Sequence, residues 1–315
     1  MRALLTVSDL EDELSQPTEG ALAALQAVQG DVMVLGAGGK MGPTLARMLR
    51  RALNALGTSH RRVRAVSRFS NPAEAESLQA HGVEVLRCDL MDRAALAALP
   101  AVENVFYLAG QKFGTSDAPE KTWVMNTLVP ALVAERFAAS RIVVFSTGCV
   151  YPLAAVAGPG SREGDALTTP GEYANSCVGR ERVFEHFSKT HGTPMLLYRL
   201  SYAIDLRYGV LVDVAQKVQR GEPVDVTMGY ANVIWQGDAN ARAIQCLEHV
   251  SCPPMPLNVT GLERVSVREL AARFGELMGK PVNLIGKEAD EAWLFDAAKS
   301  DERFGQPRVT EEAMI

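Results

Sequence analysis

Short runs of apolar residues alternate with longer segments of helical pattern from residue 30 onward. The apolar runs cover residues 31–35, 63–67, 83–86, 104–108, 141–145 and 195–200. Beyond Arg141, the run at 141–145 is apolar at every position, which is typical of a strand buried on both faces. Long segments between the runs, at 43–56, 120–139 and 172–190, have the length of helices that cross a sheet. This alternation predicts an α/β fold with a doubly wound parallel sheet.

Two parts of the chain depart from this alternation. Residues 1–29 precede it, with a helical pattern that ends at Gly30, and we interpret them as an N-terminal helical extension. Glycine and proline interrupt the pattern after residue 200, although Ser266 begins a capping-box sequence for one further helix. We therefore predict a main domain over 30–200, rejoined by 233–250, and a smaller substrate lobe over 201–315.

Composition and charge narrow the class of protein. The chain has 315 residues, 47% of them hydrophobic, and its net charge of −5 predicts no nucleic-acid partner. Its five cysteines are scattered, and an acidic run at 9–13 interrupts any signal-peptide pattern. Polar residues and glycine break the longest apolar stretch, 142–157, which argues against a membrane span. The histidines lack metal-ligand spacing. We expect a cytoplasmic protein that binds no metal, membrane or nucleic acid.

A glycine-rich loop follows the first predicted strand. It has the spacing GxxGxxG directly before the first long helix. Glycine allows a tight turn and a close backbone approach to a pyrophosphate, while the helix N-terminus supplies N–H donors. The strand before the loop and the helix after it are the context that this motif needs. We therefore interpret 30–200 as a dinucleotide-binding domain. The cofactor-binding residues of the loop are Gly36, Gly38, Gly39, Lys40, Met41 and Gly42.

The end of the second strand bears on the choice of nucleotide. NAD sites usually have an Asp or Glu there for the ribose 2′-hydroxyl, whereas NADP sites tend to have an Arg nearby. Here Ser67 and Arg68 end the strand, with no acid beside them. Because both side chains can hold a 2′-phosphate by charge-assisted hydrogen bonds, the sequence favours NADP, with NAD as the alternative.

More motifs follow the glycine loop in order along the chain. Residues 145–151 read Phe-Ser-Thr-Gly-Cys-Val-Tyr, and residues 173–181 read Tyr-Ala-Asn-Ser-Cys-Val-Gly-Arg-Glu. With the loop, they resemble an extended short-chain dehydrogenase/reductase of the NAD-dependent epimerase/dehydratase family, over nearly all of the chain from residue 30. The resemblance puts Thr147 and Tyr173 at the family's catalytic positions. It also implies cofactor contacts from Asp89, Leu90, Leu108, Ala109, Gly110, Asn126 and Tyr173.

The resemblance implies an activity. It suggests an NAD(P)-dependent oxidoreductase or epimerase/dehydratase-like enzyme of carbohydrate metabolism, acting on a hydroxyl of a sugar, nucleotide sugar or sugar-derived substrate. A hydride would pass between a substrate carbon and nicotinamide C4, while Thr147 orients the hydroxyl and Tyr173 exchanges its proton. The resemblance further implies a homodimer, formed through the helices near 120–139 and 172–190.

One departure from the family concerns the catalytic helix. The family has a lysine four positions after the tyrosine, where this chain has Cys177. A tyrosine with its ordinary pKa of about 10 needs a nearby positive charge to act as a base at neutral pH, and a thiol supplies none. Arg180 faces roughly the same way one turn further on, but it would have to reach back.

Three interpretations follow from this loss. In the first, catalysis persists with altered chemistry, and Tyr173 is assisted by the nicotinamide charge or by Lys112. Lys112 follows the fourth strand at the edge where such sheets bind ligands, so we count it among the cofactor contacts. In the second, the chain is a nucleotide-binding, non-redox member of the family. In the third, Glu163 or Asp165 is the acid/base group. After the sixth strand, Arg199 and Arg207 are candidates to clamp a substrate phosphate or carboxylate.

Overall fold

The structure is a computed structural model that describes residues 4–112 and 118–315. At its centre is a seven-stranded parallel sheet with the order β12-β7-β5-β4-β1-β2-β3. The strand order changes direction between β1 and β4, and open sheets of this kind bind ligands in the crevice beyond such a switch point. The predicted doubly wound parallel α/β sheet is therefore confirmed. Its strands are β1 (Val32–Leu35), β2 (Val63–Ser67), β3 (Glu84–Arg87), β4 (Asn104–Tyr107), β5 (Arg141–Thr147), β7 (Met195–Leu200) and β12 (Met255–Val259).

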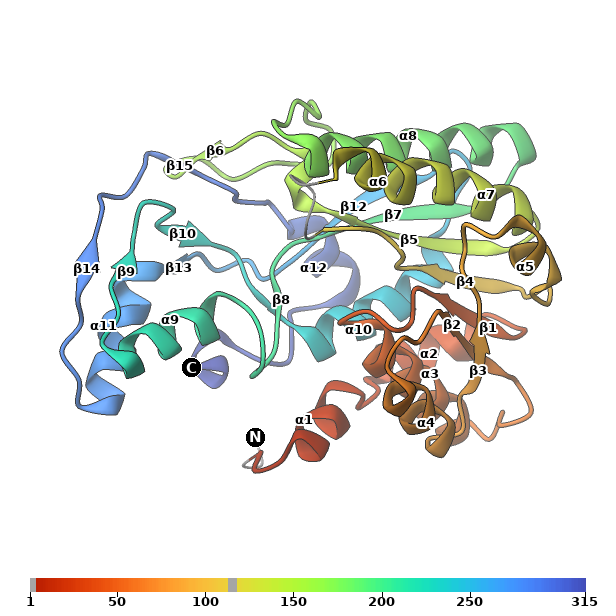
Figure 1. Ribbon diagram of the computed structural model, residues 1–315, viewed down its shortest axis with the longest axis horizontal. Coiled ribbons are helices and arrows are strands. Elements are labelled where there is room, and N and C mark those ends of the chain that lie inside the picture. The colour runs from red at the N-terminus through yellow and green to blue at the C-terminus, as the bar shows by residue number, and fades with distance from the viewer. Residues whose placement is uncertain (1–3, 113–117) are drawn as a thin grey trace.

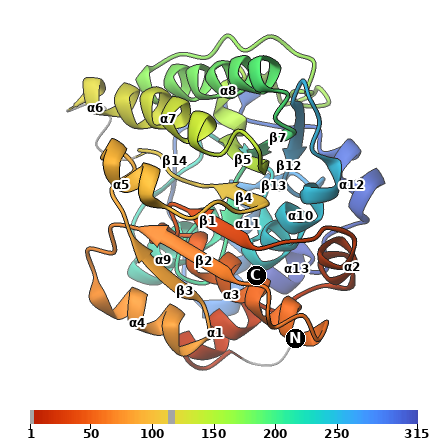
Figure 2. The same cartoon turned by 90° about the vertical axis from the view of Figure 1, so that its right-hand side faces the viewer.

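Helices cover both faces of the sheet (Figure 1), and Figure 2 shows the two layers with the strands between them. Each face has its own apolar core, because the strands are buried on both sides. One layer consists of α5 (Arg93–Ala98), α6 (Pro119–Trp123), α7 (Val129–Arg136) and α8 (Glu172–His191). The other consists of α2 (Glu19–Ala27), α3 (Gly42–Ala55), α4 (Pro72–Ala80) and α10 (Gln236–Gln245).

The helix predicted over 120–139 is interrupted. A π-helical turn, Val124–Leu128, separates α6 from α7. Asn126, in the middle of this turn, is fully buried and has hydrogen-bond partners on other elements. A sequence pattern with a period of 3.6 residues does not show such a turn, although π-helical turns often mark functional sites.

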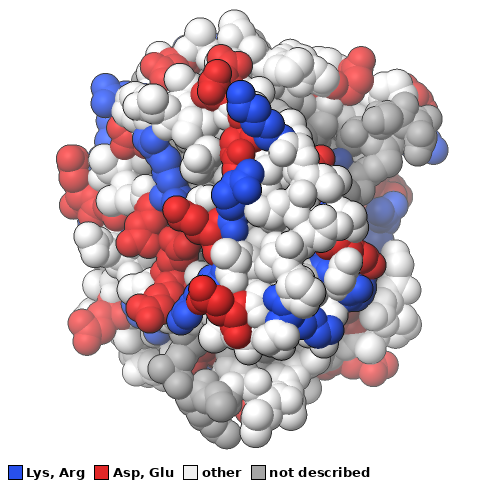
Figure 3. Space-filling model, turned by 90° about the vertical axis from the view of Figure 1, so that its left-hand side faces the viewer, with Lys and Arg blue, Asp and Glu red and all other residues white. Residues whose placement is uncertain are grey.

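The smaller lobe has its own apolar core. Ser266 caps α11 by accepting the Glu269 N–H, as the sequence predicts. On the face shown in Figure 3, acidic and basic side chains lie among one another, with acidic groups gathered toward the left of the view. The helices of the lobe are α9 (Val210–Arg220), α11 (Val267–Met278), α12 (Ala298–Phe304) and α13 (Glu311–Met314). Its short strand pairs are β8 (Ala203–Ile204) with β11 (Ile234–Trp235), β9 (Val224–Asp225) with β14 (Leu284–Ile285), β10 (Tyr230–Ala231) with β13 (Val265–Ser266), and β6 (Ala154–Ala155) with β15 (Glu291–Ala292).

Two segments differ from the domain division and the helices predicted from the sequence. β12 falls within the range predicted for the lobe, yet it pairs with β7 as the edge strand of the main sheet, where Leu257 and Val259 are buried. An additional helix, α1 (Val7–Leu14), precedes α2 and buries Leu10 and Leu14. The acidic run at 9–13, interpreted from sequence only as an interruption, therefore belongs to a capped helix. Within the described ranges, no helix is long and apolar enough to cross a membrane.

Candidate active site

The glycine loop joins β1 to α3 at the carboxyl edge of the sheet. Gly36 has a left-handed φ of 87°, and a methyl group built on it would lie 2.6 Å from the Ala109 nitrogen. One built on Gly42 would lie 2.5 Å from the Ala37 Cα. Met41 precedes α3 without a side-chain cap, so the first N–H groups of that helix stay available to an anion. The loop thus has the close approaches and the open helix end that suit a dinucleotide pyrophosphate.

Ser67 and Glu74 lie beside the glycine loop. A methyl group built on Gly38 would lie 2.7 Å from Ser67 Oγ and 3.5 Å from a carboxylate oxygen of Glu74. Glu74 belongs to the first turn of α4, which Asn71 caps by accepting the Ala73 N–H. An acid is absent at the end of β2, but one from the next helix lies beside the glycine loop. Its signal in the sequence was the N-cap Asn71 followed by an acid in the first helical turn.

Arg68 lines a hollow whose walls do not include Ser67. With Met91 and Gly110 it lines a space of about 470 Å³ between the ends of the strands and the π-helical turn. Asp89 accepts the Met91 N–H at 3.0 Å, and Leu90 is buried, so these predicted residues shape the strand end behind the hollow. Neighbouring side chains of an extended segment point to opposite sides. Ser67 lies beside Gly38 whereas Arg68 lines this separate hollow, so the sequence-based argument for NADP, which needs both side chains at one phosphate, gains no support.

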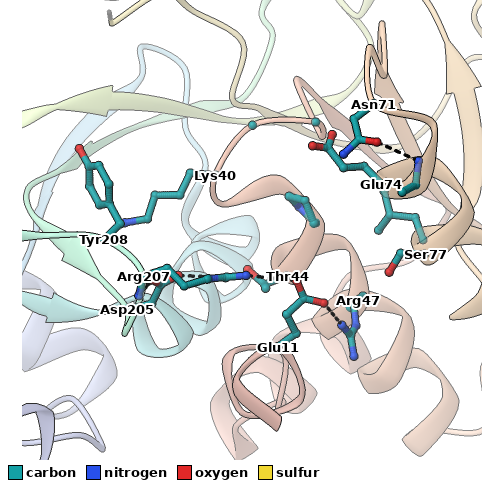
Figure 4. A pocket seen from close by; sticks show the side chains of 15 residues that line it. Glu11, Lys40, Thr44, Arg47, Asn71, Glu74, Ser77, Asp205, Arg207 and Tyr208 are labelled. Carbon is teal, nitrogen blue, oxygen red and sulfur yellow. Dashed lines mark hydrogen bonds and ion pairs between the residues drawn. The ribbon is translucent and has the colours of Figure 1, made fainter. Parts of the chain in front are cut away.

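A pocket of about 410 Å³ opens on the other side of the glycine loop. Figure 4 shows Lys40 and Tyr208 at one side of it and Asn71 with Glu74 at the opposite side. Its walls come from the glycine loop, α3, α4, α1 and the loop after β8.

Charged pairs line the lower wall of this pocket in Figure 4. Glu11 of α1 pairs with Arg47 at 2.8 Å and with Arg207 at 3.2 Å, and Arg207 also pairs with Asp205 at 3.0 Å. Glu11 therefore bridges α3 to the loop after β8. Because Arg207 already has two carboxylate partners, its predicted use as a substrate clamp gains no support here.

Lys40 reaches from the glycine loop toward the lobe. Its Nζ donates to the Ala203 carbonyl at 2.7 Å and lies 3.8 Å from the centre of the Tyr208 ring. Burial lowers the pKa of Lys40 to about 8, and the Asp205 carboxylate opposes that change. Asp205 is itself paired with Arg207, and Lys40 has no carboxylate within ion-pair distance in the described part of the chain. This ammonium is placed to receive an anionic ligand.

Lys112 stands with Lys40 rather than with Tyr173. Its Nζ donates to Tyr208 Oη at 3.4 Å, and its charge contributes to lowering the pKa of Lys40. The cation with the largest effect on the pKa of Tyr173 is Arg180. The prediction that Lys112 assists Tyr173 is therefore not supported, whereas its position near the glycine loop agrees with a cofactor contact.

Asn126 and Arg180 meet beside Gly110. Asn126 Oδ1 accepts from the Gln111 N–H at 3.0 Å and from Arg180 Nη2 at 2.6 Å, while its Nδ2 donates to Ser176 Oγ at 2.8 Å. A methyl group built on Gly110 would overlap the Arg180 guanidinium. The predicted residues Gly110 and Asn126 are thus joined to α8 through a buried arginine whose location the sequence left open.

Tyr173 lies at the start of α8, near the end of β5. Burial and the Cys177 thiol on the same helix raise its pKa, and the Arg180 guanidinium lowers it. Cys149 acts on the same hydroxyl and donates its backbone N–H to Thr147 Oγ1 at 3.2 Å. The two predicted catalytic residues therefore belong to adjoining segments at one edge of the sheet.

A buried ion pair lies behind this site. Arg199 Nη2 contacts Glu181 at 2.7 Å, and both side chains are at most 5% exposed. Arg199 also donates to the Glu163 carbonyl, so its predicted role as a substrate clamp is wrong: its donors are used inside the protein. Glu163 accepts from the Asn258 N–H and pairs with Lys299, and Asp165 accepts from the Arg162 N–H. These contacts tie the loop down and leave the third interpretation without support.

Many solved structures share this fold. UDP-glucose 4-epimerase of Thermus thermophilus, in complex with NAD, matches with a TM-score of 0.72 and 18% identity, covering 90% of this chain and 96% of that one. UDP-glucose 4-epimerase of Thermotoga maritima, with UDP-glucose, matches with a TM-score of 0.73 and 18% identity, covering 90% of this chain and 96% of that one. The dTDP-glucose 4,6-dehydratase DesIV of Streptomyces venezuelae, with NAD and TYD bound, matches with a TM-score of 0.76 and 17% identity, covering 90% of this chain and 94% of that one.

Sequence comparison assigns the family. No curated protein matches the sequence. The NAD dependent epimerase/dehydratase family matches residues 32–227, which span the glycine loop, Thr147, Tyr173 and the start of the lobe. This chain belongs to the NAD-dependent epimerase/dehydratase family.

Proposed function

We propose that the protein is an NAD-dependent epimerase or dehydratase that acts on a hydroxyl of a nucleotide sugar. The observation that carries the proposal is the meeting of two sets of residues at one sheet edge. The glycine loop approaches Ala109 at the end of β4, and Gly110, next in the chain, contacts the Arg180 side chain of the helix that holds Tyr173. The solved relatives with UDP-glucose or with NAD and TYD support nucleotide sugars as the substrate class.

Several residues of the chain would hold the cofactor. The uncapped start of α3 and the glycine loop would bind the pyrophosphate, with Lys40 adding a positive charge. Arg68 and Gly110 would line the adenine side, beside Asp89 and Leu90. When bound, NAD supplies the nicotinamide that accepts and returns a hydride.

The side chains beside the loop favour NAD over NADP. Ser67 and Glu74 both lie close to Gly38, where the adenosine ribose would pass. A carboxylate accepts a hydrogen bond from a ribose 2′-hydroxyl but repels a 2′-phosphate. We therefore propose NAD as the cofactor, in agreement with the NAD-bound relatives.

Thr147 and Tyr173 would handle the substrate hydroxyl. Among the described residues, Thr147 Oγ1 accepts one hydrogen bond, at 3.2 Å, which leaves its own proton available to orient a hydroxyl. The Tyr173 oxygen would take the proton as the hydride leaves the substrate carbon and would return it when the carbonyl is reduced again.

A homodimer is part of the proposal. Trp123 and Leu128, on the outer side of the layer predicted to form the interface, are each 38% exposed. Apolar side chains of this size suit a subunit contact better than water. Light scattering of the purified protein would test it, because Leu128→Glu should shift a dimer toward monomer. The cytoplasm stays the expected location.

Binding and turnover together test the proposed activity. We would titrate the purified protein with NAD, NADH, NADP and NADPH by calorimetry, after checking for copurified nucleotide, and assay UDP-glucose and dTDP-glucose for epimerisation and dehydration. We expect binding of NAD at micromolar strength and turnover that Tyr173→Phe reduces at least about 100-fold. A folded, empty protein that binds none of the four nucleotides would refute the proposal. NAD binding with turnover unaffected by Tyr173→Phe would refute the assigned acid/base group.

A further inference from the structure

We propose that Arg180 is the positioning cation of Tyr173, reaching back along α8 to the region where a lysine at position 177 would otherwise act. The inference rests on the proposed use of Tyr173 as the proton-exchanging group. It accounts for two features of α8: a cysteine stands at position 177, and a buried arginine follows it at position 180.

The need for a cation follows from the surroundings of Tyr173. The groups that act on its hydroxyl are the thiols of Cys177 and Cys149 and the Arg180 guanidinium. Burial disfavours the tyrosinate that a proton-accepting tyrosine must form, and the neutral thiols supply no positive charge to offset it. Arg180 works in the opposite direction. Without it, the hydroxyl would lie in an apolar site with no positive charge from α8.

Neutral groups hold the guanidinium in place. Arg180 is 6% exposed, donates to the Phe145 carbonyl at 3.0 Å and to Asn126 Oδ1 at 2.6 Å, and lies 5.9 Å from the centre of the Tyr107 ring. Phe145 precedes Thr147 by two positions on β5. The cation is therefore anchored to the strand that carries one catalytic residue and lies on the helix that carries the other.

The charge of Arg180 is not used up in an ion pair. Glu181, its neighbour in the chain, contacts Arg199 and Ser146. No carboxylate lies within ion-pair distance of Arg180 among the described residues, and its buried Nε has no hydrogen-bond partner. Burying a cation without a carboxylate is costly. Arg199 offsets that cost with Glu181, whereas the charge of Arg180 stays available to Tyr173 on the same helix face.

Cys177 leaves room for this arrangement. It is fully buried and lies one helical turn from both Tyr173 and Arg180 on the same face of α8. Positions four and seven residues after Tyr173 share that face, so the cation can come from either of them. An arginine with a pKa above 12 keeps its proton at neutral pH. It would therefore influence Tyr173 by charge alone and take no part in relaying protons.

The test measures the ionisation of residue 173 directly, in the protein without added cofactor. A fluorotyrosine incorporated at position 173 ionises at lower pH than tyrosine, and ¹⁹F NMR follows its titration. We expect Arg180→Met to lower the ionisation constant at least about tenfold, and Arg180→Lys to restore part of it. Cys177→Lys combined with Arg180→Ala returns a cation to the helix face and should bring the constant back toward the parent value.

A matched control separates charge from helix damage. Arg182 is an exposed arginine of the same helix, paired with Glu185, and Arg182→Met should leave the titration unchanged. Circular dichroism melting would verify that each variant is folded. If Arg180→Met does not fold, Arg180→Lys and the Cys177/Arg180 exchange carry the test. Equal ionisation constants with and without the Arg180 charge, in folded variants, would overturn the inference.

Failure of this inference can be told apart from failure of the proposed function. A protein that binds no NAD but shows the expected ¹⁹F shift keeps Arg180 as the cation of Tyr173 and loses the enzyme assignment. A protein that binds NAD and turns over a nucleotide sugar, with a ¹⁹F titration insensitive to Arg180, keeps the enzyme assignment and loses the cation.

Discussion

Lys40 and Tyr208 form a contact between the glycine loop and the loop after β8, with the ammonium 3.8 Å from the centre of the ring. The two residues come from segments far apart in the sequence and meet at the pocket of Figure 4. The partners of this ammonium are neutral, a ring and the Ala203 carbonyl, so a phosphate would be the first anion to pair with it. Under the proposed function, Lys40 would contact both the cofactor and the lobe, and we therefore expect cofactor affinity to be sensitive to it.

The first prediction concerns the pH dependence of cofactor binding. Lys40 has a pKa of about 8, lowered by burial. It is charged below that pH and neutral above it, so NAD affinity should fall as pH rises from 7 through 8 and beyond. Calorimetry in buffers of different ionisation enthalpy should also detect proton uptake near pH 8. In Lys40→Met the affinity should be lower and nearly flat over this range. A wild-type affinity independent of pH would contradict the assigned role.

The second prediction concerns Glu74 and the choice of nucleotide. Glu74→Gln removes the charge that opposes a 2′-phosphate, so NADP affinity should rise about tenfold or more relative to NAD. Glu76→Gln, an exposed change on the same helix, serves as the control and should leave the ratio unaltered. Titration of both variants with NAD and NADP gives the comparison. An unchanged ratio in Glu74→Gln would mean that this carboxylate does not face the ribose.

The third prediction concerns Gly36. Gly36→Ala places a methyl group 2.6 Å from the Ala109 backbone at a left-handed φ, so neither the loop nor β4 can relieve the overlap cheaply. We expect a loss of NAD binding and a fall of about 1–3 kcal/mol or more in the free energy of unfolding. Gly57→Ala has a similar φ of 68° but open space around it, and should cost only roughly 1 kcal/mol. Urea unfolding measures both variants, and equal costs would rule out the close approach.

The fourth prediction concerns the buried pair of Glu181 and Arg199. Arg199→Met leaves a carboxylate without its cation in a site where both side chains are at most 5% exposed. The free energy of unfolding should fall by about 3–5 kcal/mol. Arg182→Ala breaks an exposed pair on the same helix and should cost less than about 1 kcal/mol. Denaturant unfolding that gave both variants the same stability would show that burial does not strengthen the effect of this pair.

Much of the fold follows from local patterns. The strands at 63–67 and 195–200 agree with β2 and β7 residue for residue, because both runs are mostly apolar, as a parallel strand buried on two faces requires. The glycine spacing likewise predicts the strand–loop–helix unit around Gly36, since a turn of this tightness requires glycine at particular positions. The sequence did not predict that β12 belongs to the main sheet, because the residues of a strand do not determine which strand it pairs with.

For the candidate site too, the sequence predicted some residues, while others were recognised only in the folded structure. By resemblance, the sequence alone predicted Thr147 and Tyr173 as catalytic residues, and it showed that Cys177 cannot act as a cation. Tertiary structure decided where the charges go: Glu74 lies beside Gly38, Arg199 is paired with Glu181, and Arg180 turns inward. An arginine or glutamate reads the same in a sequence whether it is solvated or buried. Its partners come from distant segments, so its chemistry is set only when the chain is folded.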